Sequence, residues 1–325
     1  MAYNVLVTGV GAIIGYGIIE GLRHSGYPIK IIGMDIYDDA VGQNWCDYFE
    51  KALPANHPEY PQFMQYIIAK YSIDLVIPGI EQDAFRLSKI MDVFSNQSVK
   101  FALNSPELIE MAADKWVTHQ RLVDAGFSTI KTFIAGEFYE LTKSLGTPML
   151  LKPRRSYASK GIRRLYNEED YIYWRNILKD DFMIQEIVGH DDEEYTVAAF
   201  GYGDGACSTK ITFRRKLSGE GATAKAMVEF IPALDEIVDR LADYFKPLGP
   251  TNFQFRKHAG EYLLLEINPR ISSSTSLRTA FGFNEAKMCL EYFVLGKRIE
   301  IPQIRRGHAI RYIKDMVFYD GSSNR

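Results

Sequence analysis

The segment 252–270 carries the residues best suited to chemistry in this chain. Two stretches of alternating polar and apolar residues flank a turn at Ala259-Gly260, which predicts a β-hairpin. A hairpin centred on Gly260 places Gln254 opposite Glu266, and Asn268 lies on the same face because successive strand side chains alternate. Clustered oxygen ligands of this kind suit Mg²⁺, which takes one or two protein ligands together with phosphates and waters. The plainer alternative is an amphipathic hairpin whose polar face meets solvent.

Pro269 and Arg270 weigh against that plainer alternative. Pro269 ends the second strand directly after Asn268. Arg270 then stands at the edge of the predicted sheet, where its guanidinium would lie beside bound phosphates. We therefore expect Arg270 to take part in any phosphate chemistry at this hairpin.

Residues 1–104 predict an α/β domain that precedes the hairpin. An apolar run at 5–7 leads into a glycine turn, a helix over 12–23 and a second strand over 29–35. Further strand and helix patterns follow in the same alternation, which is typical of a parallel sheet. A capping serine and Pro106 open a new helix, so we place the end of the first domain there.

The second half of the chain predicts an α+β architecture built mainly on antiparallel sheet. Short strands follow one another in hairpin-like succession, and a helix over 233–245 precedes the hairpin. We assign residues 105–310 to this domain and 311–325 to a C-terminal tail. The expected strands cover 149–152, 182–185, 195–199 and 210–213.

Composition excludes several classes of protein. The 325 residues carry a net charge of −3, which supplies no general basic field for nucleic acid. The three cysteines stand far apart without CxxC spacing, so neither a disulfide framework nor a zinc site is expected. No run of about 20 apolar residues predicts a membrane span. We expect a cytoplasmic protein that binds neither nucleic acid nor membrane.

The motif Glu-Ile-Asn-Pro-Arg at 266–270, with Gln254 upstream, resembles the metal-binding signature of the ATP-grasp superfamily. It is most similar to one synthetase half of the carbamoyl phosphate synthetase large subunit, in which a Gln, a Glu and an Asn hold Mg²⁺. The resemblance implies that Gln254, Glu266 and Asn268 are metal ligands. Most other ATP-grasp families have an acid where this chain has Gln254.

Further segments resemble motifs of the same family and follow one another along the chain in the same order. The resemblance implies phosphate contacts from a helix start, from a strand end and from the loop 156–162 that follows it. It also implies adenine contacts from the backbone of a hinge and a ribose contact from an acid before the strand at 195–199. The implied nucleotide-binding residues are Lys115, Lys152, Ser159, Gly161, Glu186, Ile187, Val188 and Glu194, with Glu193 as an alternative to Glu194.

The cationic run 214–216 precedes a loop that contains two glycines. Such a cluster is usually a solvated face. In the family the corresponding stretch borders the second substrate, and a planar guanidinium suits both phosphate and carboxylate. Arg214 or Arg215 is therefore the expected contact, and we take Arg214, Lys152 and Arg270 as the expected catalytic set.

The resemblance also implies a fold and a reaction. The fold is a Rossmann-like pre-ATP-grasp domain over 1–104, followed by an ATP-grasp fold with lobes at about 125–187 and 188–310. The cofactors are ATP and Mg²⁺, with two ions expected and Mn²⁺ as a substitute metal. The reaction activates a small-molecule carboxylate as an acyl-phosphate for attack by an amine or related nucleophile, releasing ADP and phosphate. A homodimer is an open alternative for the assembly.

A glycine turn near the N-terminus keeps a different function open. Gly9, Gly11 and Gly15 form a GxGxxxG pattern after a strand, and Asp35 stands near where the acidic partner of an NAD ribose would be. This pattern fits an NAD(P)-dependent oxidoreductase. The structural interpretation is that the glycines allow a tight turn and close helix–strand packing, and the resemblance favours it. A nucleotide-binding protein without turnover is the third alternative, against which the metal set argues.

Overall fold

The computed structural model describes residues 2–156, 161–219 and 221–318. Contacts divide the chain into two compact units. The first unit comprises residues 1–104, 223–228 and 270–325, and the second comprises 105–222 and 229–269. The segment 270–310, which we expected in the second domain, thus groups with the N-terminal residues.

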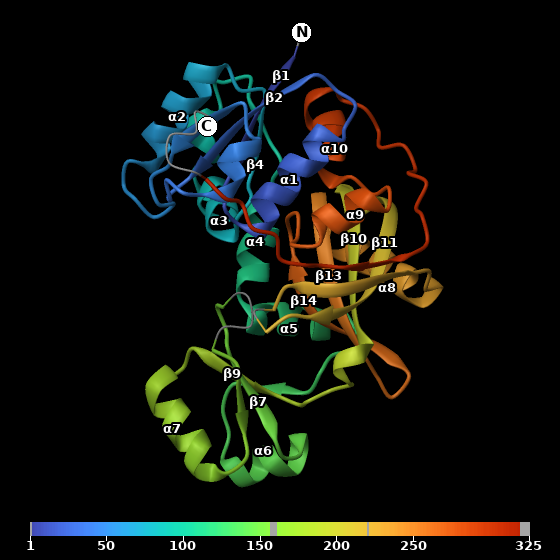
Figure 1. Ribbon diagram of the computed structural model, residues 1–325. Coiled ribbons are helices and arrows are strands. Elements are labelled where there is room, and N and C mark those ends of the chain that lie inside the picture. The colour runs from blue at the N-terminus through green and yellow to red at the C-terminus, as the bar shows by residue number, and fades with distance from the viewer. Residues whose placement is uncertain (1, 157–160, 220, 319–325) are drawn as a thin grey trace. The chain divides into compact units, whose positions relative to one another are not determined.

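A five-stranded parallel sheet forms the centre of the first unit (Figure 1). Helices connect its strands, which is why neighbouring strands run in the same direction. In spatial order the strands are β3 (Tyr48–Lys51), β2 (Ile29–Asp35), β1 (Tyr3–Thr8), β4 (Leu75–Ile77) and β5 (Lys100–Phe101). The connecting helices are α1 (Ile13–Arg23), η1 (Val41–Trp45), α2 (Tyr60–Tyr71), α3 (Glu81–Lys89) and η2 (Met91–Phe94).

Two short helices from the C-terminal part, α9 (Thr275–Ala280) and α10 (Glu285–Cys289), pack against α1. Glycines on α1 allow this close approach. A Cβ atom at Gly17 would lie 2.8 Å from the side chain of Thr275, and one at Gly21 would lie 2.9 Å from that of Asn284. This packing explains why the segment after Arg270 belongs to the first unit. The π-helix η4 (Leu290–Val294) follows, and β15 (His308–Ile310) pairs with β12 (Thr223–Glu229).

The second unit contains a small antiparallel sheet that Figure 1 shows with two helices on one side. In spatial order its strands are β6 (Thr132–Phe133), β9 (Phe182–Gln185), β7 (Met149–Pro153) and β8 (Arg163–Leu165). The helices are α6 (Phe138–Leu145) and α7 (Glu168–Leu178). Buried apolar side chains from both helices and from the strands form one core, which includes Leu141, Leu151 and Tyr171.

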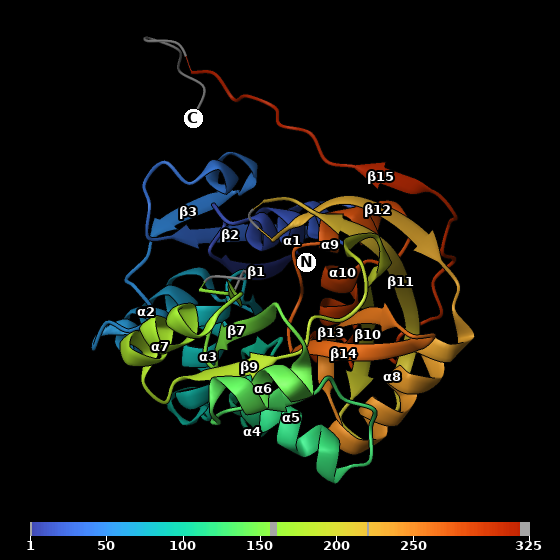
Figure 2. The same ribbon diagram turned by 90° about the horizontal axis from the view of Figure 1, so that it is seen from below.

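The second unit also contains the larger strands of the chain. They lie in the order β14 (Glu261–Asn268), β13 (Leu248–His258), β10 (Glu194–Tyr202) and β11 (Cys207–Leu217), all antiparallel. The helix α8 (Pro232–Phe245) packs against β10 and β11 (Figure 2). The remaining elements are α4 (Pro106–Ala113), α5 (Lys115–Asp124) and the short η3 (Asp191–Glu193).

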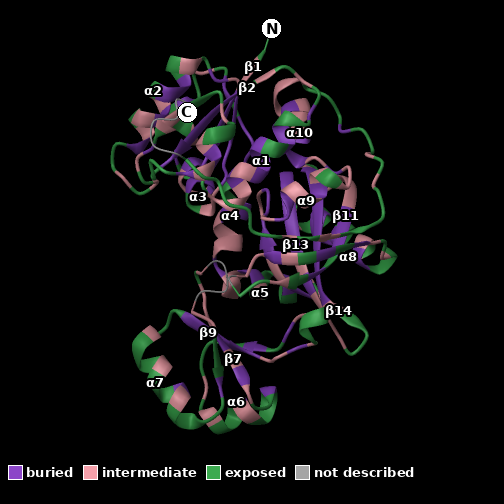
Figure 3. Cartoon of the chain, in the orientation of Figure 1, coloured by how far each residue is buried: buried purple, intermediate pink, exposed green. Residues whose placement is uncertain are grey.

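The sequence of α8 explains its position on the sheet. Proline at its first turn suits a helix start, since the missing N–H has no intrahelical partner there. Leu234, Val238 and Leu241 recur at helical spacing and are fully buried in a core shared with Phe253 and Phe255 of β13. Figure 3 shows buried residues concentrated on these strands.

The predicted parallel first half and antiparallel second half are confirmed. The four strands expected at 149–152, 182–185, 195–199 and 210–213 correspond to β7, β9, β10 and β11. Within the described residues, no helix is long and apolar enough to span a membrane.

Candidate functional site

One face of the four large strands is polar, although most of its side chains are buried. Directly opposed residues on neighbouring antiparallel strands point to the same face. Glu194 opposes Arg256 on one side and Arg215 on the other, while Gln254 opposes Thr196 and Glu266. We call this surface the polar face: Glu194, Thr196, Arg215, Asn252, Gln254, Arg256, Glu266 and Asn268.

The predicted pairing of Gln254 with Glu266 is confirmed, and Asn252 opposes Asn268. The centre of the hairpin differs from the expectation. Near the tip His258 opposes Glu261, so the predicted turn Ala259-Gly260 is confirmed, but the strands at the tip pair about the middle of these two residues and not about Gly260. One extra residue on β14, between the partners of Phe255 and Gln254, shifts the register by one. This β-bulge restores the pairing on which the metal prediction depends.

The predicted metal ligands therefore lie together on the polar face. They comprise one carboxylate, Glu266, and two amides, Gln254 and Asn268. Among the described residues, no group of three or more His, Cys, Asp or Glu side chains could hold a metal ion. A set with one carboxylate fits Mg²⁺ when phosphate oxygens complete its coordination and share its charge. The residues present thus fit a cation that arrives together with a phosphorylated ligand.

Asn252 is a member of the polar face that the sequence analysis did not single out. It precedes Gln254 by two residues in β13, and residues two apart in a strand point to the same face. This spacing could have identified Asn252 from the sequence. Its Oδ1 accepts a hydrogen bond of 2.5 Å from Thr196 Oγ1. This bond fixes the amide beside Asn268, the residue it opposes.

Glu194, the predicted ribose ligand, is held by two arginines. Arg215 Nη2 donates to Glu194 Oε1 at 2.8 Å, and Arg256 Nη2 donates to Glu194 Oε2 at 2.8 Å. Arg215 Nη2 also donates to Gln254 Oε1 at 2.8 Å. Glu194 is 4% exposed, so these charge-assisted bonds offset the cost of burying its carboxylate. Arg256 was not predicted, although its spacing from Gln254 places it on the same face.

Lys152, at the end of β7, is positioned by the neighbouring strand β9. Its Nζ donates to Gln185 Oε1 at 2.6 Å, and Gln185 Nε2 donates in turn to Thr132 Oγ1 at 2.9 Å. Loss of hydration lowers the pKa of Lys152 to about 8; nearby Glu266 opposes this shift, whereas Lys115 adds to it. An anion that binds here would favour the charged ammonium. Gln185 is thus a functional candidate that the sequence analysis missed.

Lys115, the first residue of α5, is placed by a cap and by the end of β7. Asp114 caps the helix by accepting from the N–H groups of Trp116 and Val117, and its carboxylate pairs with Arg154 at 2.7 Å. Burial alone would raise the pKa of Asp114, but the bonds from Arg154 and the helix N–H groups hold it below its usual value. Lys115 Nζ donates to the backbone oxygen of Ser156 at 2.5 Å. Lys115 also lies close enough to Lys152, the other lysine predicted to bind phosphate, to lower its pKa.

The predicted phosphate loop is described only at its ends. Ser159 lies outside the described residues, as do its neighbours from 157 to 160. Gly161 adopts a positive φ of 80°, a conformation that favours glycine.

The predicted adenine hinge, Glu186 to Val188, follows β9. The N–H of Glu186 donates to the Lys131 oxygen at 3.1 Å. Val188 is buried in a small apolar cluster with Ile130 and Leu263, which anchors the end of the hinge.

The two arginines predicted to be catalytic, Arg214 and Arg270, are not members of the polar face. Arg214 points to the opposite face of the sheet from Glu194, because it alternates with Arg215, and its Nε pairs with Glu229 at 2.8 Å. The structure therefore brings Arg215, and not Arg214, to the polar face. Arg270 belongs to the first unit, where its guanidinium pairs with Glu81 at 2.9 Å.

The N-terminal glycine turn is occupied by groups of the protein itself. Asp35 Oδ2 accepts a hydrogen bond of 2.8 Å from the N–H of Gly11. A Cβ at Gly15 would lie 2.2 Å from the Gly9 oxygen, and one at Gly42 would lie 2.1 Å from the Val10 oxygen. The glycines thus serve tight packing, and the turn amide that a dinucleotide phosphate would need already binds a carboxylate. These contacts favour the structural interpretation of the motif over a dinucleotide site.

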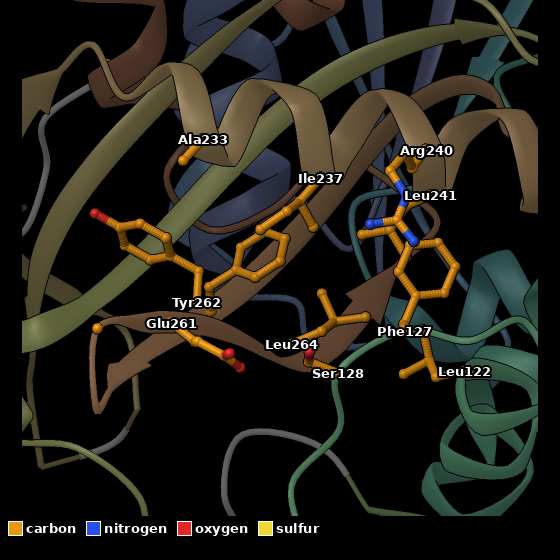
Figure 4. Close-up of a pocket in the computed structure, with 12 residues that line it drawn as sticks. Leu122, Phe127, Ser128, Ala233, Ile237, Arg240, Leu241, Glu261, Tyr262 and Leu264 are labelled. Atoms are coloured by element: carbon orange, nitrogen blue, oxygen red, sulfur yellow. The ribbon is translucent and has the colours of Figure 1, made fainter.

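The apolar face of the sheet carries a cavity of about 230 Å³ (Figure 4). It lies between the end of α5, α8 and the tip of the hairpin, and its walls include Leu122, Ile237 and Leu264. At one end the guanidinium of Arg240 lies over the ring of Phe127, 4.8 Å from its centre. None of the predicted site residues lines this cavity.

Known proteins share sequence or fold with this chain. A family model described as an ATP-grasp in the biosynthetic pathway with the Ter operon matches residues 179–316. The C-terminal section of the carbamoyl phosphate synthase large chain from Aquifex aeolicus is 24% identical over 230 residues, covering 63% of this chain and 42% of that relative. The chain thus spans less than half the length of this curated relative.

Solved structures with the same fold include a synthetase and a carboxylase. The N5-carboxyaminoimidazole synthetase from Staphylococcus aureus superposes with a TM-score of 0.74 at 14% identity, covering 94% of this chain and 81% of that one. A biotin carboxylase from Campylobacter jejuni, in a complex with a β,γ-ATP ligand, gives 0.73 at 17% identity, covering 95% and 74%. The chain thus shares its fold with these structures, and its residues 179–316 match the ATP-grasp family model.

Proposed function

We propose that this chain is an ADP-forming ligase that uses Mg-ATP to activate a carboxylate for attack by an amine or related nucleophile. One observation carries the proposal. The polar face gathers the oxygen donors Gln254, Glu266 and Asn268 with a buried acid, and Lys152 is close enough to Glu266 for that carboxylate to influence its pKa. Oxygen donors beside phosphate-binding cations suit a metal–nucleotide complex.

In this proposal the nucleotide-binding and metal-binding residues come from the second unit. Lys115 and Lys152 bind phosphate oxygens, and Glu194 orients the ribose. The backbone of Glu186, Ile187 and Val188 holds the adenine. Bound Mg²⁺, held by the three donors of the polar face, supplies charge neutralisation at the transferring phosphoryl group.

The remaining roles concern the substrate and the first unit. Arg270 would brace the acyl-phosphate oxygens with its guanidinium. The first unit would be the Rossmann-like pre-ATP-grasp domain of the family. The substrates would be a small-molecule carboxylate and an amine, and the two Mg²⁺ ions, Mn²⁺ substitution, homodimer and cytoplasmic location stay predictions.

Isotope transfer tests the reaction type. A screen of carboxylates and amines for ADP release identifies a substrate pair. With that pair, ¹⁸O in the substrate carboxylate is expected in the released phosphate, because the carboxylate oxygen attacks phosphorus before the amine attacks carbon. Hydroxylamine would trap the intermediate as a hydroxamate when the amine is omitted. Release of AMP, or unlabelled phosphate during confirmed ligation, would exclude the acyl-phosphate route.

A further inference from the structure

Arg215 makes contacts that the proposed roles of its neighbours do not explain. Its Nη2 donates to Glu194 Oε1 and to Gln254 Oε1, at 2.8 Å in each case, and its Nε donates to Glu194 Oε1 at 3.2 Å. Gln254 Oε1 is the atom that would ligate a divalent cation. One guanidinium therefore bridges the proposed ribose ligand and a proposed metal ligand.

The charges around this bridge oppose a cation that arrives alone. Arg215 is 6% exposed, and charges interact more strongly where water is excluded. Arg256 pairs with the same Glu194 carboxylate, so two guanidinium groups face this one buried carboxylate, and Arg256 also lies 3.5 Å from the exposed Asp191. Glu266, which opposes Gln254, would attract a cation, whereas the guanidinium bonded to Gln254 Oε1 would repel it until nucleotide phosphates offset its charge.

The amide at position 254 fits the same arrangement. A carboxylate there would form an ion pair with Arg215, which would compete with a metal for its oxygens. An amide oxygen accepts the bond from Arg215 and keeps a second lone pair for a cation. The pairing of Gln254 with Arg215 is a physical reason for an amide where most ATP-grasp families have an acid.

We propose that Arg215 is a positioning residue that makes cation binding at Gln254 depend on the nucleotide. Its guanidinium holds the Glu194 carboxylate and the Gln254 amide in a fixed relation, and its charge repels a divalent cation until phosphate charge is present. This inference rests on the proposed binding of Mg-ATP at the polar face.

Mn²⁺ binding in the absence of nucleotide tests the proposal. The full chain is titrated with Mn²⁺, and the free ion is quantified by electron paramagnetic resonance. We expect Arg215→Gln to bind Mn²⁺ about tenfold more tightly than the wild type, because one repelling charge is removed. A merely structural role of Arg215 predicts the opposite change, since a disturbed site loses affinity.

Two further variants separate charge from position in the sequence. Lys216→Gln removes the same charge one residue away, from a side chain that is 63% exposed, and is expected to bind Mn²⁺ as the wild type does. Arg215→Lys keeps the charge, and its Mn²⁺ affinity is expected within about twofold of the wild type. If Arg215→Gln does not fold, Arg215→Lys still tests the proposal, because a tenfold gain in a variant that keeps the charge would overturn it.

Failure of this inference differs from failure of the proposed function. Stabilisation of the wild type by Mg²⁺ and a non-hydrolysable ATP analogue is measured first in a thermal melt. Its absence contradicts the proposed function itself. Stabilisation together with unchanged or weaker Mn²⁺ binding in Arg215→Gln contradicts only the role of Arg215.

Discussion

Two segments of this chain resemble nucleotide-binding motifs, and they differ in what already occupies their polar groups. At the N-terminal glycine turn, the N–H of Gly11 donates to Asp35, and backbone atoms fill the space beside the glycines. On the polar face, Glu266 and Asn268 stand with Gln254 in a row of oxygen donors beside lysines and arginines. The comparison teaches that a motif's function depends on its surroundings as much as on its spacing: packed backbone lies beside the glycines, whereas side-chain oxygens and cations gather on the polar face.

The largest effect on activity is expected from removing the metal ligands of the polar face. Glu266→Gln removes its only predicted anionic metal ligand while preserving shape, and we expect ADP formation to fall by on the order of a hundredfold or more. Asn268→Ala is expected to act similarly, and Gln254→Ala less severely. Circular dichroism and the melting temperature should stay close to those of the wild type. Near-normal turnover of Glu266→Gln would remove this carboxylate from the metal site.

The choice of nucleotide sharpens the comparison between the two motifs. Mg²⁺ with an ATP analogue at about a hundred times its Kd should stabilise the native chain by about 2.7 kcal/mol, because it binds only the folded state. NADH at the same concentration is expected to leave the melting temperature unchanged. Stabilisation by NADH without a response to Mg-ATP would indicate that the glycine turn, and not the polar face, binds the nucleotide.

A mutation at the turn itself should affect stability and spare binding. Asp35→Asn weakens the carboxylate bond to Gly11 in a buried position, and we expect it to cost about 1–3 kcal/mol of unfolding free energy. The exposed Asp38→Asn, which breaks only a surface pair with Lys51, serves as the control and should cost less than about 1 kcal/mol. Mg-ATP affinity is expected to match the wild type in both variants, as measured by calorimetry. A selective loss of Mg-ATP binding in Asp35→Asn would place the nucleotide at the turn.

The smallest expected effect concerns pH. The pKa of Lys152 in the folded chain is about 8, below the value of about 10.4 in an unfolded chain. Between these values the unfolded chain binds more protons, so Lys152 makes the unfolding free energy rise with pH in this interval.

Binding of phosphate to Lys152 reverses this preference, because the anion favours the ammonium. Mg-ATP binding near pH 8 is therefore expected to take up a proton, and the affinity should fall by roughly fivefold to tenfold from pH 7.5 to 9. Calorimetry in buffers of different ionisation enthalpy measures the proton uptake. Lys152→Arg stays charged throughout and should lack the decline. A parallel decline in both proteins would assign the pH dependence to another group.

The sequence permitted a local prediction of the hairpin but not of the contacts between distant strands. Gln254 and Glu266 flank one turn, so alternation was enough to place them in one hairpin, but their direct pairing depends on the extra residue of β14, which alternation does not predict. Arg214 and Arg215 could not be distinguished, because the choice depends on which residue of β11 opposes Glu194. Gln185 gave no signal as a partner of Lys152, since that contact depends on β9 lying beside β7.

The grouping of residues 270–310 shows a second limit of the same kind. Their helices α9 and α10 associate with α1 through close approaches at Gly17 and Gly21. The local sequence of neither segment indicates that it packs against the other. Local patterns thus predicted the elements, whereas packing between segments far apart in the chain determined the units.

The bulge in the β13–β14 hairpin has a practical consequence for protein engineering. The extra residue on β14 lies between the hairpin tip and the donors Gln254 and Glu266. The strand pairs at the tip therefore have a register of their own, separate from that of the donors. A Cβ added at Gly260 would meet no atom within 4 Å. A peptide tag or a fluorophore attachment site grafted between Ala259 and Gly260 would project from this ladder without altering the spacing of the donors. The same hairpin can thus carry both the proposed metal ligands and a reporter of their binding.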